Sequence, residues 1–484
     1  MNRFPRSLLS VLALVAMGNA GVAAGQAPPT NVVLIIVDDL GWRDLGITGS
    51  TLYSTPVIDR LAREGTRFSR FYSASPVCSP TRASLMTGRN PARLGITNWI
   101  GGEQQGQLRQ ADYERALPLD ERTIGEAFRD RGYVTGYIGK WHLGTDQFMP
   151  SHQGFDTIIA VNNAGQPGSY FPPYGRVGAP TAVPDLTGDP PEAYLTDRLT
   201  DAAVRFIAAR RREPFLLVLA HYTVHTPLEA PAALVAAYEE EIGTAGSMPT
   251  TDPIAERTAT TRSRQDHAVY AAMVETLDRG IGRITDTLRT LGLDDRTAVV
   301  FVSDNGGLST IQGSRPGPTS NLPLRAGKGW LYEGGIRIPL IVRWPGVTQP
   351  GLVLGTPATT DDLFPTLLEL AGIARSTDVP LDGLSLAPLF RGDSLPSRPL
   401  FWHFPHYHGS GNHPSGAVRD GNYKLLEWFE DGRVELYDLA ADSTETNDVS
   451  DTQPEVAERL LALLHNWRAQ IGARMPKPNP DWPR

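Results

Sequence analysis

The chain contains a run of apolar, mostly β-branched residues at Asn31–Val37 (NVVLIIV), with no polar residue after its first position. A run without alternation between apolar and polar residues is typical of a strand buried on both faces of a parallel sheet. Comparable runs follow at residues 214–220, 297–303 and 338–344, with a shorter one at 133–138. Stretches with helical spacing of apolar residues separate them, at residues 123–131, 196–211 and 270–291. This alternation predicts an α/β fold with a large mixed, mostly parallel central sheet flanked by helices.

The 484 residues of the chain are enough for more than one structural unit. After residue 370, short strand-like pieces at residues 416–428 and 433–438 precede a final helix. One face of that helix is apolar, with Val456, Leu460, Leu464 and Trp467. We therefore predict a main domain at residues 25–370 and a smaller α+β C-terminal subdomain at residues 371–484. Two polar or Pro- and Gly-rich stretches, residues 162–191 and 242–264, are expected to be long surface loops.

The N-terminus has the pattern of a secretory signal peptide. Arg3 and Arg6 precede an apolar run at residues 8–17, and small residues lead to a cleavage position near Ala24. The run is about ten residues long, well short of the roughly 20 that span a bilayer, so a retained anchor is the less favoured alternative. We predict a signal peptide at residues 1–24 and an exported protein, periplasmic or secreted, without a stable membrane anchor.

Charge and cysteine content narrow the function further. The net charge of −8 does not favour binding to nucleic acid or other polyanions, so an anionic substrate requires a local cluster of cations. Cys78 is the single cysteine, which excludes a disulfide within the chain. In an exported protein such a thiol is expected either to be buried in the core or to be chemically altered.

Polar side chains follow two of the predicted strands directly. Asp38 and Asp39 come after the first strand, and Asp304 and Asn305 come after the strand at Thr297–Ser303. Ligands of open α/β sheets bind at the carboxyl ends of the strands, so the two pairs can converge. Three carboxylates and an amide oxygen are hard ligands that suit Ca²⁺ or Mg²⁺. An acidic residue after a strand is also common turn chemistry, so each pair alone is a weak signal.

The segment Cys78-Ser79-Pro80-Thr81-Arg82 places a nucleophile next to a cation. Pro80 is suited to the first turn of a helix, which would put Cys78 at the helix N-terminus, where anions are favoured. Arg82 is four residues further on and therefore lies on the same helical face.

Three further candidate groups follow predicted strand ends or turns. Lys140 and His142 belong to the sequence GKWHLG, where an extended backbone would place both side chains on one face. His225 comes just after the strand at residues 214–220, and Lys328 lies between two glycines. Singly, each would more often be structural or solvated, but their positions allow one cleft to gather them.

The residues 78–89, CSPTRASLMTGR, resemble the signature of type I, formylglycine-dependent sulfatases of the alkaline phosphatase superfamily. The similarity extends over nearly all of the chain after the signal peptide, through VDD at 37–39, GKWH at 139–142, HTP at 225–227 and SDNG at 303–306. It implies hydrolysis of sulfate esters by residues 25–370. It also implies that a formylglycine-generating or other sulfatase-maturating enzyme converts Cys78 into formylglycine.

The resemblance implies a role for each candidate. Formylglycine 78, as its hydrate, attacks sulfur while Ca²⁺ is held by Asp38, Asp39, Asp304, Asn305 and residue 78. Arg82, Lys140 and Lys328 offset negative charge, and Asp304 accepts the proton of the attacking hydroxyl. His225, as an imidazolium, protonates the leaving group with Lys328, and His142 deprotonates the second hydroxyl that releases sulfate.

The substrate is expected to be a sulfated carbohydrate, of galactose or N-acetylgalactosamine type, or an aryl sulfate. Candidate substrate-binding residues are Asn162 and three histidines of one aromatic-rich stretch, His403, His406 and His408; incidental histidines of a surface loop are the alternative. Three other functions stay open: a broad-specificity arylsulfatase, a phosphonate or phosphodiester hydrolase of the same superfamily, and an inactive protein that binds sulfated glycans.

Overall fold

The computed structural model describes residue 1 and residues 30–244, 253–313, 316–374 and 380–483. The predicted signal peptide therefore lies, apart from Met1, outside the described residues. Nine described strands form one central sheet, in the order β12-β2-β11-β9-β1-β6-β4-β5, with β13 beside β2. Their bounds are β1 (Asn31–Val37), β2 (Thr66–Tyr72), β4 (Val134–Gly139), β5 (Thr157–Ile159), β6 (Phe215–Ala220), β9 (Thr297–Ser303), β11 (Arg337–Arg343), β12 (Leu352–Leu354) and β13 (Ala358–Thr359).

Most neighbours in this sheet are parallel. β1 pairs in parallel with β6 on one side and with β9 on the other, and β4 pairs in parallel with β5 and β6. β11 is antiparallel to both of its neighbours, β2 and β9. The predicted large mixed, mostly parallel sheet is confirmed, and the five apolar runs form β1, β4, β6, β9 and β11.

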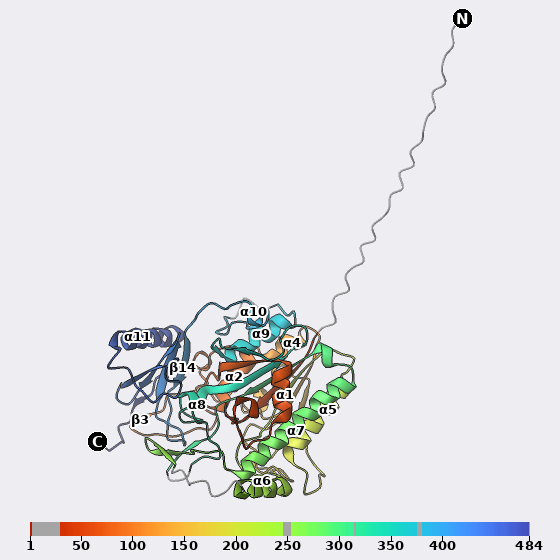
Figure 1. The fold of residues 1–484 in the computed structure, drawn as a ribbon, viewed down its shortest axis with the longest axis horizontal. Helices are drawn as coiled ribbons and strands as arrows, with labels where there is room; N and C mark the ends of the chain where they lie inside the picture. Colours follow the sequence, from red (N-terminus) through yellow and green to blue (C-terminus); the bar gives the residue numbers. More distant parts are fainter. Residues whose placement is uncertain (2–29, 245–252, 314–315, 375–379, 484) are drawn as a thin grey trace.

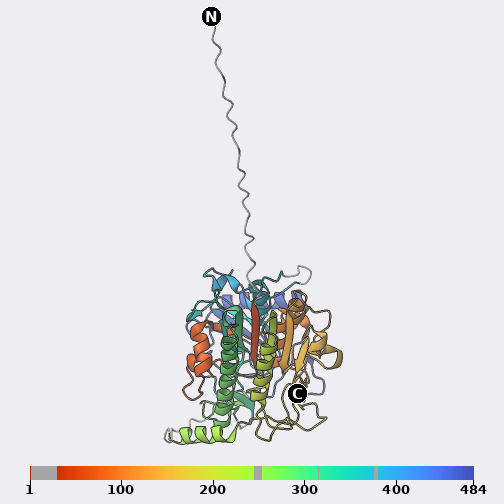
Figure 2. The ribbon, with the colours of Figure 1, turned by 90° about the vertical axis from the view of Figure 1, so that its right-hand side faces the viewer.

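Helices cover both faces of the sheet (Figures 1 and 2). One face carries α1 and the long pair α5 and α7, with α6 packed against α7. The other face carries α2, α3, α4, α9 and α10. The bounds are α1 (Pro56–Glu64), α2 (Cys78–Thr87), α3 (Pro91–Leu94), α4 (Ile124–Arg129), α5 (Leu195–Ala209), α6 (Ala232–Thr244), α7 (Ala268–Thr290), α9 (Leu363–Leu370) and α10 (Ala387–Phe390).

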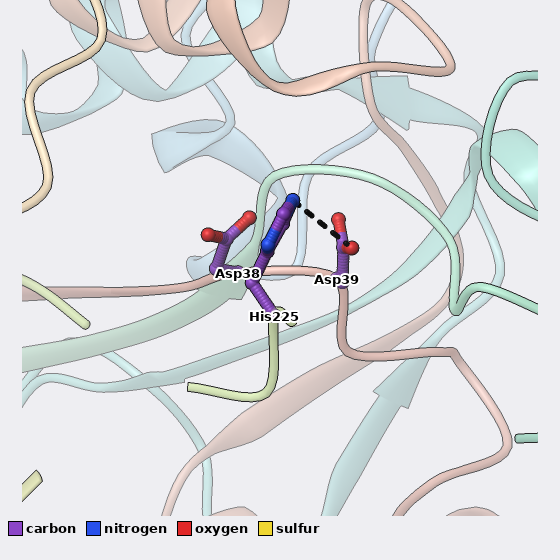
Figure 3. A group of neighbouring side chains, drawn as sticks. All are labelled: Asp38, Asp39 and His225. Atoms are coloured by element: carbon purple, nitrogen blue, oxygen red, sulfur yellow. Dashed lines mark ion pairs between the residues drawn. The ribbon is translucent and has the colours of Figure 1, made fainter. Parts of the chain in front are cut away.

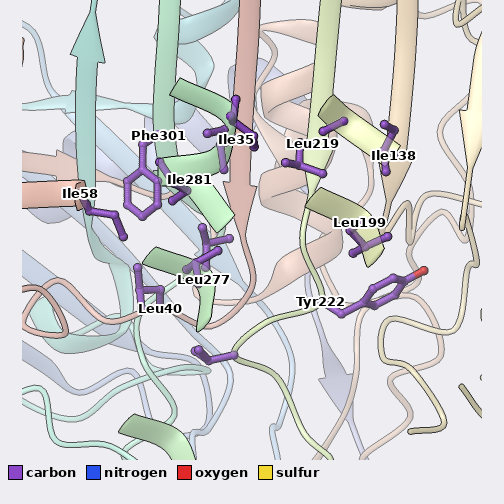
Figure 4. Packing of buried hydrophobic residues seen from close by; sticks show 14 of the residues in the cluster. Ile35, Leu40, Ile58, Ile138, Leu199, Leu219, Tyr222, Leu277, Ile281 and Phe301 are labelled. Carbon is purple, nitrogen blue, oxygen red and sulfur yellow. The ribbon is translucent and has the colours of Figure 1, made fainter. Parts of the chain in front are cut away.

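Burial of the sheet on both faces explains the absence of polar alternation in its strands. Alternate side chains of β1 enter two different hydrophobic clusters, because successive residues of a strand point to opposite faces. Ile35 faces the side of α7, where it packs among Leu277, Ile281 and Phe301 (Figure 4). Leu34 lies in the cluster on the opposite side. The sheet is thereby held rigidly between two helical layers.

The C-terminal part adds a second, antiparallel sheet of four strands, blue in Figure 1. Helix α11 packs on one face, and the other face packs against the aromatic residues Trp330 and Tyr332 of the segment that follows β10. The remaining bounds are β3 (Leu108–Arg109), β7 (Ile254–Glu256), β8 (Ala259–Thr261), β10 (Thr310–Gln312), α8 (Glu333–Ile336), β14 (Leu400–Phe404), β15 (Ser415–Asp420), β16 (Tyr423–Trp428), β17 (Val434–Asp438), α11 (Pro454–Ile471) and β18 (Lys477–Pro478).

Two segments differ from the expected organisation. The stretch at 242–264, expected to be a loop, contains the end of α6 and the short strands β7 and β8. β7 pairs with β8, and β8 pairs with β10; residues 245–252 lie outside the described part. Strands of three residues with a partner far along the chain leave no readable period in the sequence. The first residues after 371 still belong to the main core, since Leu386 and Phe390 pack in the hydrophobic cluster between the central sheet and α2. The second sheet begins only at Leu400.

No helix in the described part of the chain has both the length and the apolar content needed to cross a bilayer.

The packing of α7 on the sheet yields a stability prediction. Replacing the fully buried Leu277 by alanine leaves a cavity against β1 and β9, and we expect the free energy of unfolding to fall by about 2–5 kcal/mol. Urea unfolding followed by tryptophan fluorescence measures this change. Leu119→Ala is the control, because Leu119 is 47% exposed, and it should cost less than about 0.5 kcal/mol. Equal effects of the two substitutions would contradict the described core.

Candidate active site

The carboxylates after β1 and β9 lie side by side at one edge of the central sheet. The parallel register pairs Val37 with Ser303, so Asp38 and Asp304 occupy equivalent positions on neighbouring strands. The backbone N–H of Asp39 donates to Oδ1 of Asp304 at 3.2 Å. Asp39 has a positive φ of 61°, a conformation that aspartate tolerates better than most residues. The predicted convergence of the two acidic pairs is therefore a consequence of strand register.

Each of the three carboxylates is paired with one buried cation. Lys140 Nζ lies 2.6 Å from Asp38 Oδ2, Arg82 Nε lies 2.8 Å from Asp304 Oδ2, and Lys328 Nζ lies 2.7 Å from Asp39 Oδ1. Burial raises the pKa of Asp39, but Lys328 and the other nearby cations outweigh burial and hold it below its usual range. Burial raises the pKa of Asp38 well above its usual range, although Lys140 opposes this effect. Within each pair, the cation offsets the negative charge of its carboxylate.

Two oxygen atoms of this group have no hydrogen-bond partner. They are Oδ1 of Asp38 and Oδ1 of Asn305, and both are buried. Asn305 is held by its amide nitrogen, which donates to Asp39 Oδ1 at 2.8 Å. Ligand atoms of Asp38, Asp304 and Cys78 all lie within 4.8 Å of one another. A divalent cation with oxygen ligands would satisfy these orphaned atoms, so the donor set fits Ca²⁺ or Mg²⁺.

Cys78 is the first residue of α2, as the sequence predicts. Every residue of this helix is buried, and its N-terminus carries the partial positive charge of the helix dipole. Burial raises the pKa of the Cys78 thiol, and the carboxylates of Asp304 and Asp38 add to this effect against Lys140 and Lys328. The thiol is therefore protonated at neutral pH, and an unaltered Cys78 is a poor nucleophile.

His142 presents a free nitrogen at the site. Its Nε2–H donates to the carbonyl of Ile100 at 3.1 Å, which leaves Nδ1 as a buried acceptor without a partner. Burial lowers the pKa of the ring well below its usual value, and Lys140 lowers it further. The expectation of an extended backbone at GKWHLG is wrong, because β4 ends at Gly139 and His142 has a φ of 60°. The ring packs on Gly165, where a Cβ would lie only 2.4 Å from it.

His225 projects between the carboxylates of Asp38 and Asp39 (Figure 3). Its Nδ1–H donates to the carbonyl of Thr226 at 2.9 Å, and its Nε2 lies 3.7 Å from Asp39 Oδ2. Burial, followed by the charge of Lys328, lowers the pKa of the ring to about 3. The expected imidazolium is therefore disfavoured by the protein groups alone, and the ring is neutral at neutral pH.

A cavity of about 310 Å³ opens onto this group. Four of the six predicted catalytic residues line it, namely Cys78, His142, His225 and Lys328. Arg82 and Lys140 do not, since both are fully buried behind the carboxylates and Arg82 also donates to the carbonyl of Lys140 at 2.8 Å. The outer wall consists of Trp99, Gln104, Ala164, Gly165, Gln166, Leu308, Ile311, His408, Gly409 and Ser410.

Comparison with known protein families identifies the family to which this chain belongs. A family profile described as "Sulfatase" matches residues 30–373, which contain every predicted metal-binding and catalytic residue. The chain belongs to the sulfatase family. A second profile, described as "N-sulphoglucosamine sulphohydrolase, C-terminal", matches residues 326–470. The family resemblance predicted from the motif around Cys78 is confirmed, and this sulfatase is a sulfuric ester hydrolase of the alkaline phosphatase-like superfamily.

Individual relatives cover the chain almost completely. N-acetylgalactosamine-6-sulfatase of Mus musculus is 33% identical and covers 96% of this chain and 85% of its own. Arylsulfatase A of Homo sapiens is 33% identical and covers 97% of this chain and 92% of its own. The crystal structure of Ps i-CgsB superimposes with a TM-score of 0.75 at 31% identity, over 91% of this chain and 92% of that one. The same protein was solved in complex with k-i-k-neocarrahexaose.

Of the four predicted substrate-binding residues of this sulfatase, His408 lines the cavity. The other three lie off it. Nε2–H of His403 donates to the carbonyl of Arg474 at 2.9 Å, His406 Nε2 bonds the Thr97 hydroxyl at 2.8 Å, and Asn162 Nδ2 donates to the carbonyl of Thr181 at 3.3 Å. His403 and His406 are buried, and their pKa values are lowered by burial. Clustering of histidines in the sequence therefore does not place them at one site.

Several cavity residues carry no signal in the sequence. Trp99 and Gln104 come from the loop after α3, Gln166 comes from the loop after β5, and Leu308 and Ile311 come from the segment that contains β10. None belongs to a periodic pattern or a motif, because only the tertiary arrangement of these loops brings them together.

The pairing of Arg82 with Asp304 yields a second prediction. In metal-free buffer, Arg82→Leu leaves the Asp304 carboxylate buried without its cation, and we expect the free energy of unfolding to fall by about 3–5 kcal/mol. The double variant Arg82→Leu/Asp304→Asn removes both charges and should be more stable than Arg82→Leu alone. Denaturant unfolding of both variants and of Asp304→Asn alone completes the comparison. If the effects of the two substitutions simply add, the two groups are not coupled as the structure indicates.

Proposed function

We propose that this sulfatase removes O-sulfate from a carbohydrate after Cys78 has been converted to formylglycine, with Ca²⁺ held by Asp38, Asp39, Asp304 and Asn305. One observation carries this proposal. Ligand atoms of Asp38, Asp304 and residue 78 lie within 4.8 Å of one another at the positive end of α2. A metal, a nucleophile and the anion-favouring end of a helix thus meet at one point.

The charges of the site explain how a bound dication would attract an anionic substrate. The three carboxylates are already offset by Arg82, Lys140 and Lys328, so an added dication leaves the site with a positive charge that attracts a sulfate ester. When bound, Ca²⁺ supplies Lewis-acid polarisation of sulfuryl oxygens and lowers the pKa of a coordinated hydroxyl. Arg82 and Lys140 act here as positioning residues, because they orient Asp304 and Asp38 and do not reach the cavity.

The protonated state of the Cys78 thiol supports its conversion. A buried thiol with a raised pKa is unsuited to attack a sulfate ester, whereas the hydrate of formylglycine supplies two hydroxyls at the same position. The unpartnered Nδ1 of His142 can accept a proton at this point, since the Nε2–H is engaged by Ile100. His142 is thus the base that we assign to residue 78.

His225 and Lys328 are the groups that we assign to the leaving oxygen. Both line the cavity; Lys328 Nζ lies 2.7 Å from Asp39 Oδ1, and His225 Nε2 lies 3.7 Å from Asp39 Oδ2. The pKa of His225 is held low by burial and by Lys328, and the negative charge of a bound sulfate ester opposes both effects. Proton donation from Nε2 is therefore linked to the presence of substrate.

The cavity wall and the relatives support a sugar as the substrate. Trp99 offers an aromatic face against which the apolar face of a sugar ring can pack, and Gln104, Gln166 and His408 offer hydrogen-bonding groups for hydroxyls. The relatives include N-acetylgalactosamine-6-sulfatase and Ps i-CgsB, the latter solved with k-i-k-neocarrahexaose. A broad-specificity arylsulfatase is the second candidate. The apolar side chains of Leu308 and Ile311 in the cavity wall and the similarity to arylsulfatase A favour it.

We propose that the protein is exported to the periplasm or the exterior, based on the N-terminal sequence pattern. We also propose a sulfatase-maturating enzyme as the partner that converts Cys78 to formylglycine.

Substitution of residue 78 tests the chemistry. Cys78→Ala should abolish turnover, and Cys78→Ser should at best accept one sulfuryl group and remain sulfated, because it lacks the second hydroxyl that releases sulfate. Mass spectrometry of the peptide around residue 78 from a host with the maturation enzyme should show the aldehyde in the wild type. Sustained turnover by either variant, or an active wild type with an unmodified thiol, would contradict the proposal.

Substitution of the aromatic wall tests the substrate. On a panel of sulfated mono- and oligosaccharides, Trp99→Ala should raise KM by up to about tenfold with a smaller change in kcat, and Trp99→Phe should retain much of the affinity. Trp482→Ala is the control, because Trp482 is 49% exposed and belongs to the C-terminal end. Activity on aryl sulfates alone would refute the carbohydrate assignment, and a higher kcat/KM on matched phosphate esters would favour the phosphodiester or phosphonate hydrolase.

A further inference from the structure

A second cavity, of about 490 Å³, lies between the edge of the central sheet and the C-terminal sheet. We call it the arginine pocket, because Arg70 of β2, Arg398 and Arg419 of β15 all line it. Its other walls come from residues 355–357, 395–397 and 421–422 and from Leu400. No residue lines both this pocket and the catalytic cavity.

Two of the three arginines have no carboxylate partner among the described residues. Arg398 pairs with Asp362, but Arg70 and Arg419 make no ion pair. Arg70 Nε donates to the carbonyl of Gly355 at 2.5 Å, and Arg419 uses Nη1 on the Tyr72 hydroxyl and Nε on the carbonyl of Gly421. Arg419 is only 2% exposed, and its Nη2 is buried without any hydrogen-bond partner. A buried guanidinium nitrogen left unsatisfied requires an acceptor.

Two buried carboxylates connected to Tyr72 and Lys424 are already paired with other cations. Glu333 lies 3.2 Å from Lys424 and 3.7 Å from Arg337, and it accepts a hydrogen bond from Tyr72 at 2.9 Å. Glu445 lies 2.8 Å from the same lysine, Lys424. Burial lowers the pKa of Arg70, and the like charges of Arg419 and Arg337 lower it further. The pocket is therefore locally positive in a chain whose net charge is −8.

We propose that the arginine pocket is a second oxyanion site, which binds the sulfate group of a sulfated sugar through Arg70, with Arg419 adding positive charge from the pocket wall. Planar guanidinium groups bind tetrahedral oxyanions by paired, charge-assisted hydrogen bonds. The volume exceeds what a free ion needs and lies in the range of pockets that hold small organic ligands. The oxyanion site stands on its own geometry, whereas the glycan as the carrier of the sulfate rests on the proposed function.

Calorimetric titration of the purified protein with sodium sulfate, at constant ionic strength, tests the site. We expect Arg70→Gln to lose one sulfate site that the wild type has, with affinity at that site falling at least about tenfold. Arg67→Gln is the matched control, because Arg67 lies on the same strand, is also partly buried and does not line the pocket. Arg70→Gln is preferred to Arg419→Gln, since the buried Arg419 also supports Tyr72. Equal sulfate binding by Arg70→Gln, Arg67→Gln and the wild type would overturn the proposal.

The carrier of the sulfate group is distinguished by kinetics. If a glycan carries it, Arg70→Gln should raise KM severalfold for an oligosaccharide with two sulfates and leave KM unchanged for one with a single sulfate. If the sulfate site is lost but both KM values stay unchanged, the pocket binds free sulfate, and the glycan assignment is overturned. If no sulfated sugar is turned over at all, the proposed function fails while the titration still decides the oxyanion site.

Discussion

Three buried ion pairs at the carboxyl ends of β1 and β9 are the interaction on which the rest of this structure depends. Burying a carboxylate costs several kcal/mol unless a cation and further hydrogen bonds accompany it. The cations come from three separate places: Arg82 from α2, Lys140 from the end of β4, and Lys328 from the segment before α8. The site is therefore complete only when all of these segments are packed on the sheet, which links folding of the core directly to chemistry.

The central sheet and the C-terminal part contribute different walls of the cavity. The parallel strands position the predicted metal-binding and catalytic residues, because β1, β9, β6 and β4 all end at the same edge. The outer wall comes from loops and from the segment between β14 and β15, which contributes His408 and Ser410. Trp330, close to Lys328, packs within the aromatic cluster of the second sheet and donates to the carbonyl of Ser410 at 3.0 Å. In the proposed function, the catalytic groups follow strand ends, whereas the substrate contacts come from loops, as expected when specificity varies on a common scaffold.

The sequence was sufficient for features that depend on local order along the chain. The apolar run of β1 predicted a buried strand, and the aspartates that follow it lie beside Asp304, since parallel strands that end together bring their next residues together. The metal at this point stays a prediction. Cys78 could be placed at a helix N-terminus from its neighbours alone. The extended backbone expected around His142 was wrong, because the positive φ of this residue cannot be recognised from the order of residues in the sequence. Features set by tertiary packing were out of reach, among them the burial of His403 and His406 and the arrival of Trp99 at the cavity.

The central claim is that residues after β1, residues after β9 and residue 78 share one divalent cation. A crystal structure of the matured protein grown with Ca²⁺, with anomalous scattering used to locate the ion, tests it most directly. The account predicts one strong peak with oxygen atoms of Asp38, Asp39, Asp304 and Asn305 at about 2.3–2.6 Å, including the two oxygens that lack a partner here. An ion bound elsewhere would contradict the account. So would Asp38 and Asp304 opening onto different cavities, where they cannot share one ion.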